Sequence, residues 1–146
     1  MTITEALVAE HVVFHNLFDH VERVVPGLKT LAGVQTLAGA LVSTLKAHSE
    51  GEDKLLIEPL EHGMDHLGQR ETFHEEHEEI DEKLRAACTA RTVEKAKRAL
   101  QVAVLLAREH FDKEERLVFP MAEKLLSQKT LKELGRKWHE QRKVTG

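Results

Sequence analysis

Histidine is the residue type that stands out in this chain, with ten copies among 146 residues. The pairs His48 and Glu52, and His110 and Glu114, share one short motif, in which a histidine is followed four residues later by a glutamate. Residues four apart lie on the same side of a helix, so each motif would present an imidazole and a carboxylate together. Without thiolate ligands, these donors suit iron, manganese or zinc. The motifs therefore predict a metal site built from nitrogen and oxygen donors.

The remaining composition narrows the chemistry further. Cys88 is the one cysteine, which excludes an internal disulfide and any zinc or iron–sulfur site built from several thiolates. The absence of tyrosine argues against a tyrosyl radical beside a metal. A net charge of −4 and an isoelectric point near 6.2 disfavour binding to nucleic acid or anionic membranes. No apolar run approaches the roughly 20 residues of a membrane span, and the N-terminal residues are unlike a signal peptide, so we expect a cytoplasmic protein.

Chain length and apolar spacing indicate a single all-α domain over residues 1–146. Apolar residues recur every three or four positions, which is the helical period, and strand-like alternation is absent. Breaks near 26–27, 63–68 and 88–92 leave short connections, so we predict an up-down-up-down four-helix bundle with a short C-terminal helix. The bundle is expected over about 3–126 and the tail helix over about 131–142, with bundle helices at 3–25, 30–61, 68–88 and 92–126.

The candidate donors interrupt the apolar stripes that mark the buried face of each predicted helix. His11 takes a stripe position in the first helix, His77 takes one in the third, and the first motif interrupts the second helix. The fourth stripe runs Ala96, Leu100, Ala103, Ala107, His110, Glu114, Leu117 and Met121. An unpaired buried carboxylate costs roughly several kcal/mol, and a bound cation would compensate for that cost. We therefore predict six metal ligands: His11, His48, Glu52, His77, His110 and Glu114.

An internal repeat relates the two halves of the chain, which looks like a duplicated helical hairpin. The segment around His11 aligns with that around His77, and the two histidine–glutamate motifs align with each other. A rise of 1.5 Å per residue places the four histidines within roughly 6 to 11 Å of one level, so one mid-bundle cluster is expected. Two carboxylates facing each other there could bridge two metals. His15 and His74 lie beside the stripes, and either could supply a fifth nitrogen.

The order of these elements resembles the hemerythrin-like (HHE cation-binding) domain family over about residues 3–126. A lone histidine, a histidine–glutamate motif, another histidine and a second motif follow one another, and each motif precedes an apolar stretch and a proline. The resemblance implies a non-heme di-iron centre, with two iron ions bridged by an oxo or hydroxo group and by two carboxylates. It also implies terminal histidine ligands and bridging glutamates, respectively His11, His48, His77 and His110, and Glu52 and Glu114. Glu10 and Glu76 match the family's tendency to place a carboxylate just before a ligand histidine.

Two departures distinguish this chain from the oxygen-carrying hemerythrins. The third helix has His74 three residues before His77, where the oxygen carriers have histidines four apart. The last motif ends in Glu114 at a spacing of four, where the oxygen carriers have an aspartate at a spacing of five. The resemblance therefore points to the broader family, which includes iron or oxygen sensors and proteins that handle nitric oxide or peroxide stress.

Three functions remain open from the sequence. The first is a protein that binds O2 or NO for sensing, storage or stress response. The second is an enzyme that processes peroxide or nitric oxide, or a factor that donates iron for cluster repair, on the same site. The third is a helical partner module with a vestigial or zinc-filled site. Four histidines would leave two coordination positions open and five would leave one, so a lower count favours reactivity over reversible binding.

The tail helix offers two readings. Its stripe of Leu131, Leu134 and Trp138 either packs on the bundle or forms a basic amphipathic surface for a second copy or another protein. Capping boxes are expected to open the first helix, from Thr2 to Glu5, and the tail helix, from Thr130 to Glu133. The other histidines are expected to be exposed bystanders: His20, His62, His66 and His139.

Overall fold

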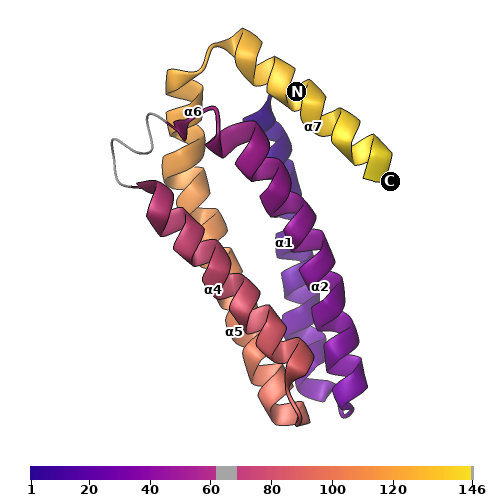
Figure 1. The fold of residues 1–146 in the computed structure, drawn as a ribbon. Coiled ribbons are helices and arrows are strands. Elements are labelled where there is room, and N and C mark those ends of the chain that lie inside the picture. The colour runs from indigo at the N-terminus through magenta and orange to yellow at the C-terminus, as the bar shows by residue number, and fades with distance from the viewer. Residues whose placement is uncertain (62–68, 146) are drawn as a thin grey trace.

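The computed structural model describes residues 1–61 and 69–145, and within those residues it contains helices and no strands. Four long helices form an antiparallel bundle, and a further helix crosses one end of it (Figure 1). The bundle helices are α1 (Ile3–Val24), α2 (Leu31–Glu52), α4 (Gln69–Thr89) and α5 (Val93–Lys113); α6 (Phe119–Leu125) extends the last of these, and α7 (Gln128–Thr145) is the crossing helix. The predicted fold is therefore confirmed.

Two parts of the expectation need separate comment. The break predicted near 63–68 and the surface positions predicted for His62 and His66 lie outside the described residues. Among the described helices, none is both long and apolar enough to cross a membrane.

The helix ends follow from local hydrogen bonds. Thr2 caps α1, because its Oγ1 accepts from the Glu5 N–H at 3.3 Å while the Glu5 carboxylate accepts from the Thr2 N–H at 3.3 Å, so the predicted capping box is confirmed. The box predicted at Thr130 is wrong. Ser127 takes the capping role instead, with its Oγ accepting from the Thr130 N–H at 3.1 Å, and α7 therefore begins at Gln128.

Each histidine–glutamate motif is followed by one π-helical turn: η2 (Asp53–Ile57) after α2 and η3 (Glu114–Val118) after α5. A π-turn holds one extra residue, so the 3.6-residue period is broken there. Leu117, predicted in the buried stripe, is 43% exposed for this reason, and the next residue, Val118, is fully buried. Ala122 likewise replaces Met121 in the core. The matching position of the two turns supports the internal repeat.

The core consists of two apolar clusters separated by a polar layer. One cluster includes Phe14, Leu45, Ile80 and Ala107, and the other includes Leu7, Leu55, Phe73 and Val118. On every bundle helix the six predicted ligands lie between a member of one cluster and a member of the other. The polar layer is therefore enclosed by apolar side chains on both sides along the bundle.

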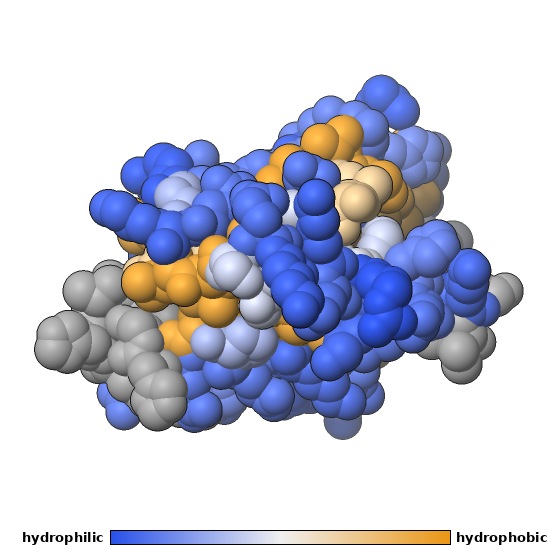
Figure 2. Space-filling model, turned by 90° about the horizontal axis from the view of Figure 1, so that it is seen from above, coloured by the Kyte–Doolittle hydropathy of each residue, from blue (hydrophilic) through white to orange (hydrophobic). Residues whose placement is uncertain are grey.

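The tail helix packs on the bundle, which is the first of its two predicted readings. Leu131 and Leu134 are buried in the second cluster beside Ile3 of α1. Figure 2 looks onto the end of the molecule that α7 crosses, where most of the visible surface is hydrophilic and hydrophobic residues show in smaller patches.

Candidate metal centre

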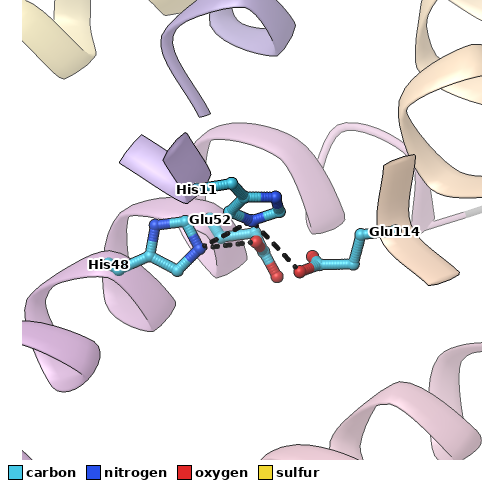
Figure 3. A group of neighbouring side chains, drawn as sticks. All are labelled: His11, His48, Glu52 and Glu114. Carbon is cyan, nitrogen blue, oxygen red and sulfur yellow. Dashed lines mark hydrogen bonds and ion pairs between the residues drawn. The ribbon is translucent and has the colours of Figure 1, made fainter. Parts of the chain in front are cut away.

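All six predicted ligands meet in the polar layer, in two overlapping sets. The first group is His11, His48, Glu52 and Glu114, and the second group is Glu52, His77, His110 and Glu114. Within each group the candidate ligand atoms lie within 4.8 Å of one another. Figure 3 shows the first group, with both imidazoles and both carboxylates directed toward a common point. The two glutamates belong to both groups.

The distances explain how the groups share their carboxylates. Glu52 places Oε2 at 3.2 Å from His48 Nε2 and Oε1 at 3.5 Å from His77 Nε2. Its two oxygens therefore face different groups. Glu114 Oε1 lies 3.5 Å from His11 Nε2 and 3.3 Å from His110 Nε2, so this oxygen faces both groups. Such an arrangement suits carboxylates that contact two cations at once.

The helices and π-turns set these positions. His48 and Glu52 lie four residues apart on the last turn of α2, so they project from one side of the helix. Glu114 is the first residue of a π-turn, and π-turns are frequent at functional sites because they redirect side chains. Each carboxylate therefore projects from the point where the α-helix ends and the π-turn begins.

Several buried polar atoms of this layer lack a hydrogen-bond partner, which favours the binding of cations here. The six predicted ligands are almost fully buried apart from His77, whose side chain is 16% exposed. Six of their atoms are buried without a hydrogen-bond partner: His11 Nδ1, both oxygens of Glu52, His110 Nε2 and both oxygens of Glu114. Each such group costs about 1–3 kcal/mol when it is left unsatisfied. Cations would satisfy most of these atoms, and the donor set fits iron.

The two carboxylates have opposite pKa shifts. Burial, together with the negative charge of Glu52, raises the pKa of Glu114 well above its usual value. Burial alone would raise the pKa of Glu52 too, but the adjoining Glu114 carboxyl, His48 and His77 outweigh it and hold that pKa well below its usual value. Opposite shifts are typical of two adjoining carboxyls that compete for one proton, and a cation would relieve the same repulsion.

The histidines of the first group differ in the same way. Burial and the positive charge of His48 lower the pKa of His11 to about 3, so its imidazole is neutral. Burial alone would lower the pKa of His48, but its hydrogen bond to Glu10 and the nearby Glu52 carboxylate raise it to about 9. In the metal-free first group, the His11 imidazole is therefore neutral, whereas the His48 imidazole keeps its proton to a higher pH.

Two outer carboxylates orient histidines of the centre. His48 Nδ1 donates to Glu10 Oε1 at 3.1 Å, and His110 Nδ1 donates to Glu76 Oε2 at 2.7 Å. Each bond joins neighbouring helices of one hairpin and directs the Nε2 atom of the histidine toward the centre, as outer hydrogen bonds do for metal-binding histidines. Sequence reasoning noted Glu10 and Glu76 only by their place before a histidine.

Aromatic rings pack against three of the four histidines of the centre: His11, His48 and His110. Phe111 stacks on His11 with ring centroids 4.0 Å apart and an interplanar angle of 10°. Phe14 meets His48 edge-on at 5.3 Å, and Phe73 meets His110 edge-on at 5.5 Å. These rings keep water away from the imidazoles. His77 instead lines a cavity of about 730 Å³ beside α4, whose other walls are mostly carboxylates.

The structure does not bring His15 or His74 into either group. His15 Nδ1 faces Arg108 Nη1 at 2.8 Å, on the outside of the α1–α5 contact. The His74 side chain is 74% exposed and lies 3.1 Å from Glu78. The structure gives no support to a fifth histidine ligand at either position.

Together, the fold and the site define a helical-bundle protein with a buried centre of histidine and glutamate that is consistent with binding two cations. The family model of the hemerythrin HHE cation-binding domain matches residues 2–122. The chain therefore belongs to the hemerythrin HHE cation-binding family, as its motifs indicated. The match ends before α7 begins. Comparison with curated proteins and with solved structures gives no match.

Proposed function

We propose that this chain is a non-heme di-iron protein that binds O2 or NO for sensing, storage or stress response. The observation that carries the proposal is the sharing of Glu52 and Glu114 between two adjacent groups of buried donors. Each group adds two imidazoles to these carboxylates, a mixture that suits iron. When bound, a pair of iron ions would supply a redox-active centre that can take up a small diatomic ligand.

The residues of this chain would bind, orient and shield that pair. Four histidines and two carboxylates leave coordination positions for a ligand that the protein does not supply. Phe111 and Phe14 make the surroundings of the first group apolar, which excludes water and admits small apolar gases. Glu10 and Glu76 hold the rings of His48 and His110 in place before any ligand arrives.

Metal analysis tests the proposal. After anaerobic loading with iron(II) and removal of excess metal, we expect about two iron atoms per chain and a visible absorption band after exposure to air. Glu114→Ala should lower the iron content, because this carboxylate belongs to both groups. The matched control His139→Ala alters an exposed residue of α7 and should leave the iron content unchanged. Zinc alone, or equal iron loss in both variants, would refute the di-iron proposal.

A second candidate is an enzyme that processes peroxide or nitric oxide, or a factor that donates iron. The placement of His15 and His74 outside both groups favours it, since a centre with four histidines has more exchangeable positions than one with five. Stopped-flow mixing of the reduced protein with oxygen, nitric oxide or peroxide separates the two functions. Binding predicts a stable and reversible spectral change, whereas an enzyme predicts consumption of many equivalents.

Association through the tail helix stays a proposal of its own. The apolar side of α7 is packed on the bundle, so a second copy or a protein partner would have to bind the exposed side. That side carries several basic residues: Lys129, Lys132, Arg136 and Lys137. Sedimentation of the purified chain at several concentrations tests for a homodimer.

A further inference from the structure

Glu10 connects the first group to the C-terminal helix. Its Oε1 accepts from His48 Nδ1 at 3.1 Å and from Trp138 Nε1 at 3.0 Å. Arg142 donates from Nε to Oε2 at 3.0 Å and from Nη2 to Oε1 at 3.2 Å, so the guanidinium holds both oxygens of the carboxylate. Arg142 Nη2 also donates to the carbonyl of Ala47, next to His48 in α2, at 3.3 Å. Two side chains of α7 thus fix the carboxylate that orients a ligand histidine.

The equivalent carboxylate of the second group is held differently. Glu76 accepts from His110 Nδ1 through Oε2 and from Lys113 Nζ through Oε1, both at 2.7 Å. Lys113 belongs to α5, the same helix as His110, so this support lies within the bundle. The two halves of the internal repeat therefore have equivalent inner ligands, but different residues hold their outer carboxylates, Glu10 and Glu76. Among the described contacts, only Glu10 is held by residues of α7.

The position of α7 is set by close packing. A Cβ atom added at Gly135 would lie 2.1 Å from the backbone oxygen of Met1, so only glycine permits α7 to cross the start of α1 this closely. A Cβ atom added at Gly51 would lie 3.2 Å from Arg142 Nη2, so glycine also leaves room for the guanidinium. Leu131 and Leu134 of α7 are buried where the helix packs on the bundle. The crossing is therefore a specific contact that brings Trp138 and Arg142 to Glu10.

We propose that Arg142 and Trp138 are positioning residues for the first group, and that α7 thereby controls cation binding at the first group but not at the second. This inference rests on the proposed binding of two cations and is independent of the gas or oxidant involved. The helix lies outside the segment that matches the family model. Outer-shell hydrogen bonds of this kind typically change metal affinity by about 10–100-fold.

The test is a titration of the metal-free full-length chain with cobalt(II), whose visible spectrum reports the ligand geometry. His77→Ala removes a ligand of the second group only, and His11→Ala removes a ligand of the first group only. We expect Arg142→Gln to weaken cobalt binding by about 10–100-fold in the His77→Ala background and to leave it unchanged in the His11→Ala background. Lys113→Gln is the matched control, and it should show the opposite dependence on background.

Trp138 is the one tryptophan of the chain, so its fluorescence separates local effects from undocking of α7. In Arg142→Gln the emission maximum should stay in place, because Leu131 and Leu134 still anchor the helix. In Gly135→Val the emission should shift to longer wavelength, and cobalt binding at the first group should weaken while circular dichroism keeps the helical signal of the bundle.

The outcomes distinguish this inference from the proposed function. A wild-type chain that binds no cobalt would overturn the proposed metal centre. A wild-type chain that binds two equivalents, with neither Arg142→Gln nor Gly135→Val changing either affinity, would overturn only the role of α7. Equal weakening in both histidine backgrounds would also overturn it, because a general loss of structure affects both groups alike.

Discussion

Replacing Glu114 by methionine should stabilise the metal-free protein and abolish its stabilisation by metal. Both carboxyl oxygens of Glu114 are buried without a hydrogen-bond partner, and burial beside Glu52 raises the pKa of this carboxyl. Methionine is similar in volume, fills the same space and has no polar group to satisfy. A residue retained for a cation is expected to reduce stability when that cation is absent.

The size of the effect follows from the contacts of Glu114. An unsatisfied buried polar group costs about 1–3 kcal/mol, and His11 and His110, at 3.5 and 3.3 Å, relieve part of that cost. We therefore expect a gain of about 1–3 kcal/mol in the metal-free state, which corresponds to roughly 3–10 °C in the unfolding temperature of a chain of this length. With metal at 100 times its dissociation constant, wild type should gain about 2.7 kcal/mol per site, whereas the variant should gain almost nothing. The order of stability should therefore reverse when metal is added.

The assay is thermal unfolding followed by circular dichroism, on chelator-treated protein under anaerobic conditions, with and without excess iron(II). Glu109→Met is a matched control, because it makes the same chemical change at an exposed position of the same helix as His110. It should leave both unfolding temperatures close to those of wild type. The reasoning is refuted if metal-free Glu114→Met unfolds below metal-free wild type, or if iron(II) raises both unfolding temperatures equally.

Further substitutions test the ligand set and the π-turn. His15→Ala and His74→Ala should retain two metals per chain by elemental analysis, while His77→Ala should lose metal; loss in all three would mean that a fifth histidine binds after all. Val118→Ala should lower the free energy of urea unfolding by about 1–3 kcal/mol and Leu117→Ala by less than about 0.5 kcal/mol, because only Val118 is buried. Equal losses would contradict the π-helical register.

The sequence alone was sufficient to place the inner donors on buried helix faces, because they follow the same period as the core. His11 and His77 occupy stripe positions, and the spacing of four between His48 and Glu52 holds in α2. Burial of a charged group among apolar neighbours is improbable without compensation, so interruption of a stripe is itself a signal. The fold followed from the same periodicity, since helices with one apolar face and short connections pack as antiparallel neighbours.

The limits of that reasoning lie where the period changes or where contacts join distant segments. Leu117 was wrongly predicted to be buried, because the apolar stripe assumes the regular α-helical period and gives no sign of a π-turn. Trp138 and Arg142 are separated from Glu10 by more than 120 residues, and their type and spacing in a basic amphipathic helix gave no sign of a role at the centre. Lys113 was missed for a related reason, since a lysine on a helix is usually solvated.

Each group of donors draws on both helical hairpins of the chain. The first hairpin contributes His11, His48 and Glu52, but the first group also requires Glu114 from the second hairpin. The second group in turn requires Glu52 from the first hairpin. Neither hairpin therefore contains all the donors of a group, although each contains two histidines and a carboxylate. Because both carboxylates belong to both groups, a change in either one alters the whole centre, whereas changes in the outer supports at Glu10 and Glu76 act on one group at a time.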